Sequence, residues 1–494
     1  STFYRFFRMS SQAASVSSAE TNIADIPLVV DIDGTLVHSD LLVESAFVLA
    51  KTSPQSLVKL PGWLRAGKAT LKAEIAQRAE LGIEQLPYNR PLIEYLHEEK
   101  AKGRRLILAT AANEKYAHQV AEHLQLFDTV LASDRDTNLA GDKKLAAIRA
   151  EVGDAPFDYA ADHEVDNAIW RHARKAVLVN ASEKLERSAN ESFDVGASFP
   201  PEKTDWRIWT KALRVHQWAK NALIFVPLLA AHQYADFGMI MAAVLAFVAY
   251  SLLASSVYIL NDLVDLGDDR QHPRKCERPF ASGRIPILQG VIAIPILLGA
   301  AVVIAAFLPP FFWAVLASYY ALTLAYSLGL KQIALIDVLT LAALYTLRII
   351  AGGAATGIPL SFWLLALSMS IFLSLAMAKR CTELLVMKEH SGDAPLGRGY
   401  IASDLPPLRS LGTAAGYTAV VILALYINSP DITNQYEHPA RIWVLCPVVL
   451  YWISRIWLKT LRGQMHDDPI VFAAKDNGSR VCVLLGALIM FMAI

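Results

Sequence analysis

The chain has 494 residues, of which 54% are hydrophobic, and it carries 46 basic and 46 acidic residues. This length allows more than one domain, and the apolar content excludes a protein that is soluble throughout. The net charge of zero says nothing about partners, although we expect no nucleic acid among them.

The apolar residues divide the chain into three predicted parts. Residues 1–25 contain a short STFYRFF segment and a Ser/Ala-rich stretch, which indicate a flexible leader rather than a secretory signal. Residues 26–200 have the composition of a soluble domain, and residues 201–494 that of a membrane domain. The four cysteines show neither metal-type spacing nor an obvious pairing, so we expect them to be reduced.

The soluble part opens with an apolar strand that ends in two acids. The sequence IPLVVDIDGTLVHSD at 26–40 contains Asp31 and Asp33 directly after the strand. It resembles motif I of the haloacid dehalogenase superfamily. The resemblance implies that Asp31 is a nucleophile that forms an aspartyl-phosphate, and that Asp33 is the acid/base that protonates the leaving oxygen.

Three further stretches resemble motifs II to IV of the same superfamily, in the expected order. They are RLILATAAN (105–113), NLAGDKKLAAI (138–148) and FDYAADHEVDNAIW (157–170). The resemblance implies an α/β domain with a small helical cap over about 45–88. Asp162 stands between Ala and His where the family usually has Gly and Ser, so the phosphatase rate stays open. The implied phosphate-binding residues are Thr110 and Lys144, and the implied Mg²⁺ ligands are Asp31, Asp33, Asp162 and Asp166.

Beyond residue 205, apolar segments recur with short charged connections between them. About 20 apolar residues span a bilayer as a helix, and a large soluble protein rarely buries so many such segments in succession. We therefore predict about nine transmembrane helices. The segments lie near 218–231, 240–260, 285–308, 310–330, 333–351, 359–378, 411–428, 442–458 and 480–494.

Lysine and arginine concentrate in alternate connections. The connections near 308–310, 352–358 and 429–440 are almost free of both residue types. The positive-inside rule then predicts that the even-numbered connections and the soluble domain are cytoplasmic, and that the protein lies in the cell (inner) membrane.

The second connection begins with dense acids, followed at once by dense bases, in NDLVDLGDDRQHPRKCERP at 261–279. At about 100° per residue, the acids fall on one stripe of a helix, where they would repel one another unless a cation lay among them. Mg²⁺ held by carboxylates and substrate phosphates resolves this repulsion. A solvated, self-neutralising loop is the alternative. The stripe comprises Asn261, Asp262, Asp265, Asp268, Asp269 and His272.

The N-D-x-x-D-x-x-x-D pattern at the end of a span resembles the first aspartate-rich motif of the UbiA superfamily of intramembrane prenyltransferases, whose members have about nine helices. HPRKCERPFASG (272–283) and YSLGLKQIALIDV (326–338) are closest to its decaprenylphosphoryl-5-phosphoribose synthase branch. Quinone-type members carry a second aspartate-rich motif in the fourth connection. Here Tyr326, Lys331 and Asp337 stand there, which counts against an aromatic acceptor.

The branch implies Mg²⁺-dependent transfer of 5-phosphoribosyl from phosphoribosyl pyrophosphate to a polyprenyl phosphate whose tail lies among membrane lipid. Asp262, Asp265 and Asp269 are then the catalytic metal ligands. Lys379 and Arg380 are alternatively topology-setting charges, and Arg348 alternatively extends to the membrane interface. The implied substrate-binding residues are Asn261, His272, Lys275, Arg278, Lys220, Tyr326, Lys331, Arg348, Lys379 and Arg380. A second charged cluster comprises His466, Asp467, Asp468, Lys475 and Asp476.

Fusion of the two domains suggests consecutive steps. We expect the soluble domain to remove the 5-phosphate and give polyprenylphosphoryl ribose, a precursor for cell-wall arabinose donors such as those of arabinogalactan. Two alternatives are a conventional prenyltransferase that alkylates an aromatic or other acceptor, and a non-catalytic membrane scaffold with a regulatory soluble domain. The chain length of the polyprenyl group and the existence of a homo-oligomer stay open.

Overall fold

The computed structural model describes residues 23–201, 205–390, 399–430, 436–465 and 468–493. Nearly all of the predicted leader lies outside these ranges. The chain divides into two compact units, which are described separately. The first comprises Ser1–Thr204 with Arg270–Glu277 and Ala281–Ile287, and the second comprises Asp205–Asp269, Arg278–Phe280 and Leu288–Ile494.

The first unit contains a six-stranded parallel sheet in the order β3-β2-β1-β4-β5-β6. Its central strands are apolar and buried on both faces, as parallel strands covered by helices must be. This sheet confirms the predicted α/β domain. The strands are β1 (Leu28–Val30), β2 (Leu106–Asn113), β3 (Thr129–Ser133), β4 (Asp158–Ala161), β5 (Lys175–Val179) and β6 (Val195–Phe199).

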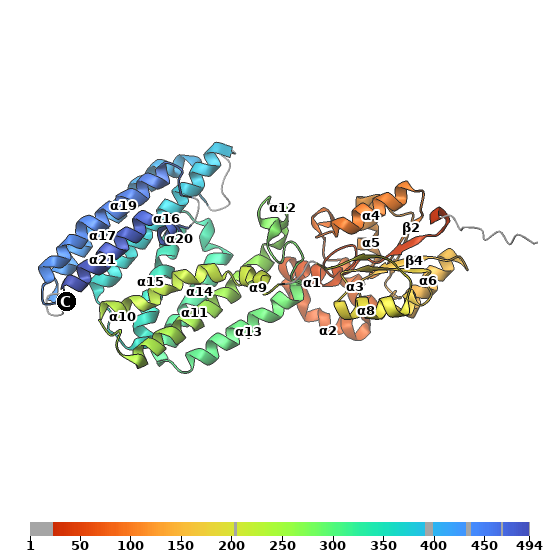
Figure 1. Cartoon of the computed structure of the whole chain (residues 1–494), viewed down its shortest axis with the longest axis horizontal. Coiled ribbons are helices and arrows are strands. Elements are labelled where there is room, and N and C mark those ends of the chain that lie inside the picture. Colours follow the sequence, from red (N-terminus) through yellow and green to blue (C-terminus); the bar gives the residue numbers. More distant parts are fainter. Residues whose placement is uncertain (1–22, 202–204, 391–398, 431–435, 466–467, 494) are drawn as a thin grey trace, which may run out of the picture. The chain divides into compact units, whose positions relative to one another are not determined.

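Helices cover both faces of this sheet (Figure 1). Because successive strand residues point to opposite faces, Leu28 and Val30 of β1 pack with α4 and α5, whereas Val29 packs with α6, α7 and α8. The helices are α4 (Arg90–Ala101), α5 (Glu114–Leu124), α6 (Asp142–Val152), α7 (Asn167–Trp170) and α8 (Glu183–Ser192).

Between β1 and α4 the chain forms helices and turns, with isolated β-bridges from Val37 to Asp33 and to Tyr88, and the helices make up the predicted small helical cap. Asp40 begins the first of them as its N-cap, since its side chain accepts hydrogen bonds from the backbone N–H groups of Leu42 and Val43. The cap elements are α1 (Leu41–Thr52), η2 (Pro54–Lys59), α2 (Leu60–Ala66), α3 (Lys68–Ala76) and η3 (Ile83–Gln85).

The second unit is helical. Among the described residues, seven helices are long and apolar enough to cross a membrane. The protein is therefore a multi-pass integral membrane protein. The long helices are α11 (Phe237–Val264), α13 (Ile287–Ala305), α14 (Pro310–Leu328), α15 (Ile336–Thr356), α16 (Phe362–His390), α17 (Leu405–Ile427) and α19 (Leu445–Leu461).

The first and last of the nine predicted segments form shorter elements. The first divides into the 3-10 helix η5 (Val215–Phe225) and α10 (Val226–Ala230), where Pro227 has no N–H to continue the preceding hydrogen-bond ladder. The last is α21 (Asn477–Ala493), an apolar helix of 17 residues. Of the nine predicted segments, seven therefore form helices long enough to cross a membrane within the described ranges, and the first and last form shorter elements.

The most buried long helix, α15, contacts η5 very closely. A Cβ atom at Gly352 would lie 2.0 Å from the carbonyl oxygen of Ile224, so only glycine permits this approach. The contact brings the polar residues of η5 beside those of α15.

Candidate active sites

The first candidate site lies at the carboxyl ends of β1 and β4, which are neighbours in the sheet. Asp31 follows β1 and Asp162 follows β4, so both acids lie at one sheet edge, the usual position of α/β active sites. Lys144, buried on α6, places its Nζ 2.7 Å from Asp31 Oδ2. The structure thus brings together residues from motifs I, III and IV.

Tyr159 completes this cluster, although no sequence motif singles it out. Its hydroxyl donates to Asp166 Oδ1 at 2.9 Å and accepts from Lys144 Nζ at 3.1 Å. Tyr159 lies inside the apolar strand β4, so its sequence context is that of a core residue. The only available signal was its position three residues before Asp162.

The acids of this site are crowded. Burial raises the pKa of Asp162 to about 7, and the carboxyls of Asp31 and Asp166 add to the shift. Burial also raises the pKa of Asp33 well above its ordinary value, with Asp40 and Asp31 contributing. Negative charge is therefore in excess at this sheet edge.

Two backbone features shape the same edge. Gly34 adopts a φ of +71°, and a Cβ atom there would lie 2.0 Å from Asp162 Oδ2, so a side chain is excluded. Thr110 is buried near the end of β2, which pairs with β1, and its Oγ1 accepts a hydrogen bond from the N–H of Ala112 at 3.1 Å. The predicted role of Thr110 in phosphate binding stays a prediction.

The second candidate site lies at the end of α11, within the helical unit. Asp262 and Asp269 are both buried, and one atom, Arg278 Nη1, lies 3.1 Å from Asp262 Oδ1 and 2.6 Å from Asp269 Oδ2. Arg214 also contacts Asp262 Oδ1, at 2.5 Å. The two carboxylates are thus close enough for a single cation to bridge them.

The residues of the acidic stripe do not lie on one continuous helix. The helix α11 ends at Val264, and α12 (Leu266–Gln271) follows after Asp265. The N–H of Asp265 still bonds to Asn261 O, and the N–H of Asp269 to Asp265 O, so the turns stay in register. Asp262 and Asp269 face the protein interior, Asn261 and Asp265 are half-buried, and Asp268 is exposed.

His272 and Lys275 belong to the stretch that groups with the first unit. Both are exposed. The Nδ1 atom of His272 accepts from the N–H groups of Arg274 and Lys275, at 3.2 and 3.3 Å. Their predicted role in substrate binding stays a prediction.

A second cationic cluster of the helical unit surrounds Asp468. Lys220 Nζ and Lys379 Nζ lie 2.8 and 3.0 Å from Asp468 Oδ2, and the hydroxyl of Tyr345 donates to the same carboxylate. Burial alone would raise the pKa of Asp468, but the Lys379 and Lys220 ammoniums outweigh it and lower that pKa below its ordinary range. Asp468 is therefore a carboxylate that holds two lysines together.

Two other members of the predicted terminal cluster are described: Lys475 is exposed, and Asp476 has other partners. Asp476 pairs instead with Arg455 and with Lys459, whose Nζ is 2.8 Å away. His466 and Asp467 lie outside the described residues.

Arg348 is buried on α15 and does not extend to an interface. Its Nε donates to Asn221 Oδ1 at 2.8 Å, and its Nη2 to the hydroxyl of Tyr319 at 3.2 Å. The guanidinium also lies 5.2 Å from the ring centroids of Tyr319 and Tyr345, a distance at which cation–π attraction operates. This placement agrees with the rule that intramembrane charges face the bundle interior.

Tyr326 and Arg380 come together around Asp337. Arg380 Nε lies 2.5 Å from Asp337 Oδ2, the hydroxyl of Tyr326 donates to Asp337 Oδ1 at 2.7 Å, and Glu383 also contacts the guanidinium. The Arg380 and Asp337 side chains are fully buried. Lys331 is half-buried on the short η7 helix (Leu330–Gln332).

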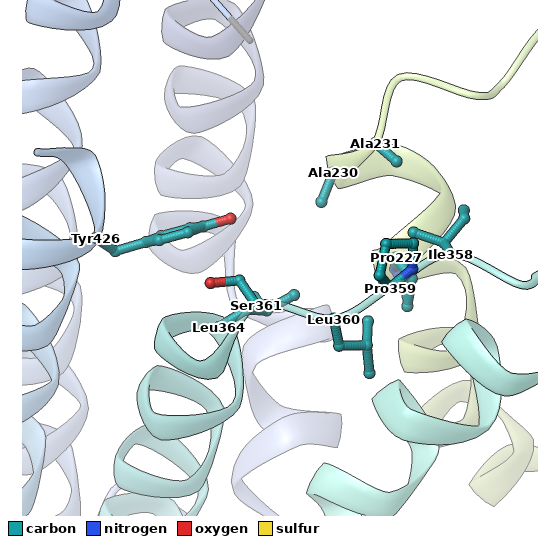
Figure 2. A pocket seen from close by; sticks show the side chains of 9 residues that line it. All are labelled: Pro227, Ala230, Ala231, Ile358, Pro359, Leu360, Ser361, Leu364 and Tyr426. Carbon is teal, nitrogen blue, oxygen red and sulfur yellow. The ribbon is translucent and has the colours of Figure 1, made fainter. Parts of the chain in front are cut away.

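A cavity of about 360 Å³ lies beside the connection between α15 and α16. Figure 2 shows the side chains that line it. Within the described part of the chain, its lining includes Pro359, Ser361 and Tyr426 but no charged side chain. It lies near the carboxyl end of α15, whereas Asp337 lies in the first turn of that helix. The cavity therefore offers no counter-charge for a phosphate and is separate from the aspartate sites.

Comparisons with known proteins agree with both units. The model of the UbiA prenyltransferase family matches residues 222–474, and that of the haloacid dehalogenase-like hydrolases matches residues 28–169. Protein y4nM of Sinorhizobium fredii is 38% identical over 467 residues, which cover 94% of this chain and 90% of that protein.

Two further relatives cover a smaller part of the chain. Nodulation protein NoeC of Azorhizobium caulinodans is 38% identical over 286 residues, covering 57% of this chain and 92% of NoeC. The decaprenyl-phosphate phosphoribosyltransferase of Mycolicibacterium smegmatis is 32% identical over 296 residues, covering 57% of this chain and 92% of that enzyme. The chain belongs to the UbiA prenyltransferase family, and it carries a haloacid dehalogenase-like domain at its N-terminus.

Proposed function

We propose that the helical unit transfers 5-phosphoribosyl from phosphoribosyl pyrophosphate to a polyprenyl phosphate of the decaprenyl type. In this reaction a phosphate oxygen of the lipid bonds to the anomeric carbon, and the bond from that carbon to diphosphate breaks. The similarity to a decaprenyl-phosphate phosphoribosyltransferase supports this choice of donor and acceptor.

The observation that carries the proposal is the presence of two separate cationic clusters in one unit. Arg214 and Arg278 gather on Asp262, while Lys220 and Lys379 gather on Asp468. Transfer between two phosphorylated substrates needs two such anion sites, because each phosphate requires its own charge-assisted hydrogen bonds. We assign the diphosphate of the donor to the first cluster and the lipid phosphate to the second.

The residues of the first cluster suit Mg²⁺. Arg278 already bridges Asp262 and Asp269 as a cation. Among the described residues no three acids, histidines or cysteines converge as a complete metal cage. Mg²⁺ does not require one, since it is usually bound by one or two carboxylates together with substrate phosphates and water. When bound, Mg²⁺ would neutralise charge on the departing diphosphate.

We further propose that the N-terminal domain removes the 5-phosphate from the lipid product. The Asp31 carboxylate would attack phosphorus while Asp33 gives a proton to the departing ribosyl oxygen. Burial, with the carboxyls of Asp40 and Asp31, raises the pKa of Asp33, and this shift favours the protonated form that a proton donor needs. The excess of carboxylates near Asp162 also suits a bound Mg²⁺.

The charge pattern of the connections supports an inner-membrane location with a cytoplasmic N-terminal domain. Both reactions would then occur on one side of the membrane, so the product of the first would be accessible to the second.

The test uses the purified full chain with phosphoribosyl pyrophosphate, decaprenyl phosphate and Mg²⁺. Mass spectrometry of the lipid fraction should detect decaprenylphosphoryl-5-phosphoribose and then decaprenylphosphoryl ribose. Transfer of a prenyl group from a polyprenyl diphosphate to an aromatic acceptor, with no phosphoribosyl lipid formed, would contradict the proposal. A product that keeps its 5-phosphate indefinitely would contradict its phosphatase part.

A further inference from the structure

A cavity of about 360 Å³ lies beside Asp33 in the first unit, within the size range of small-molecule sites. It is lined by the cap and by the end of β2. Among the described residues, its lining includes Asp33 but none of Asp31, Lys144, Asp162 and Asp166. Since Asp33 is the proposed proton donor to the leaving oxygen, this cavity is on the leaving-group side and would receive the rest of the substrate.

Two lysines of the cap helix α3 line this cavity. Lys68 and Lys72 are four positions apart, so they share one face of the helix. Lys72 is half-buried, and its Nζ lies 2.5 Å from Ala111 O and 2.8 Å from Asn138 Oδ1. Lys68 is exposed at the cavity.

Both direct contacts of Lys72 are neutral oxygens. Within the described ranges, no carboxylate lies within 4 Å of the ammonium of Lys72 or Lys68 as a salt-bridge partner. Burial lowers the pKa of Lys72, while the carboxyls of Asp33 and Asp40, which also line the cavity, act against that shift without forming an ion pair with Lys72. A half-buried ammonium that lacks a paired carboxylate and borders a cavity is suited to an anion supplied by a ligand.

A purely structural role is the competing explanation, because the same two hydrogen bonds tie the cap to the sheet. Lys115 offers a matched comparison. Its Nζ bonds to Ala76 O at 2.8 Å and to Glu80 at 2.7 Å, so it also ties the cap to α5, but it does not line the cavity.

We propose that Lys72, with Lys68 beside it, binds a second anionic group of the phosphatase substrate. The substrate class is a sugar phosphomonoester that carries a phosphodiester at another carbon. This inference rests on the proposed function, because a phosphoribosyl lipid has its phosphodiester on the anomeric carbon, on the leaving-group side of the scissile 5-phosphate. Lys72 would thus select this substrate over a simple sugar phosphate.

The test compares two soluble substrates of the full-length protein at saturating Mg²⁺. One is 5-phosphoribosyl 1-(butyl phosphate), which has the phosphodiester, and the other is ribose 5-phosphate, which lacks it. The wild type should prefer the phosphodiester substrate in kcat/KM. Lys72→Met should reduce this preference at least about tenfold, mainly by raising KM, as expected for a lost charge-assisted contact. Lys72→Arg should retain most of the preference.

The control Lys115→Met should keep the preference even if it lowers both activities. Equal losses on the two substrates in Lys72→Met would overturn the inference and leave Lys72 as a tether of the cap. A wild type that hydrolyses both substrates equally well would overturn the inference alone. A wild type that hydrolyses neither would overturn the inference together with the proposed phosphatase function.

Discussion

Asp265 offers the cleanest test of the proposed diphosphate site. Its side chain has no hydrogen-bond or ion-pair partner among the described residues, so Asp265→Asn leaves the cluster of Asp262, Asp269 and the two arginines intact. The substitution keeps an oxygen ligand and removes one negative charge. We expect transfer to fall at least about 100-fold, the scale found when one preorganised electrostatic contact is lost, which is about 2.7 kcal/mol.

Asp268→Asn is the matched control. Asp268 lies in the same acidic segment but is exposed, and its substitution makes the same chemical change. We expect less than about a threefold change in transfer. The Leu263 side chain points to another side of α11, but Leu263→Ala is a poorer control. Leu263 is buried, and a Leu→Ala cavity costs about 2–5 kcal/mol of stability.

Asp262 and Asp269 should behave differently from Asp265. Their substitution by Asn weakens contacts to Arg278 that are worth about 1.5–3 kcal/mol each. These variants should therefore lose thermal stability as well as transfer, whereas Asp265→Asn should lose transfer alone.

The assay is the initial rate of lipid product formation over a Mg²⁺ titration, with the melting temperature of each variant measured in the same detergent. Asp265→Asn should need more Mg²⁺ for half-maximal rate. If Asp265→Asn and Asp268→Asn give the wild-type rate and the wild-type Mg²⁺ requirement, Asp265 is not a metal ligand and the reasoning from the acidic stripe is refuted.

Three further predictions concern the phosphatase and the topology. Asp31→Asn should stop dephosphorylation while transfer continues, so that the 5-phosphorylated lipid accumulates in the lipid fraction; an unchanged product ratio would contradict the assigned nucleophile. Gly34→Ala should lower phosphatase turnover at least about 100-fold, because a Cβ atom would collide with Asp162 and φ is positive, and near-normal turnover would contradict this geometry. In intact cells a membrane-impermeant maleimide should label Phe307→Cys and spare the native Cys276 until the cells are permeabilised; the reverse pattern would invert the proposed topology.

The phosphatase motifs were predictable from sequence because their geometry is local. Each acid directly follows an apolar strand, and parallel strands place their carboxyl ends at one edge of the sheet. The sequence alone therefore indicates that Asp31 and Asp162 lie close together. Tyr159 could not, since a strand residue with apolar neighbours gives no sign that its hydroxyl joins Lys144 to Asp166.

The cavity beside Asp33 was also not predictable from the sequence. It depends on how α3 turns Lys72 toward Ala111, 39 positions away in the chain. The sequence between motifs I and II predicted a polar-faced helical cap, but amphipathic spacing does not identify which polar residues face the catalytic edge.

Lys379 and Arg380 illustrate the same limit within the membrane domain. The sequence predicts that both bind phosphate. However, adjacent positions on a helix point about 100° apart, so the two side chains cannot serve one small site equally. Arg380 is fully buried and meets Asp337 and Glu383, so its charge is already balanced within the protein. Lys379 is partly exposed and shares Asp468 with Lys220.

Lys379 and Arg380 thus differ in burial and in their ion-pair partners, and this difference determines how each contributes to the proposed transfer. A phosphate that approaches Lys379 competes with one carboxylate that two lysines already share, and two ammoniums can accommodate a second anion. A phosphate that approaches Arg380 would have to separate its guanidinium from two carboxylates, and breaking the buried pair with Asp337 costs about 3–5 kcal/mol. We therefore expect Arg380 to fix α15 against α16, and the binding of a substrate phosphate by Lys379 stays a prediction.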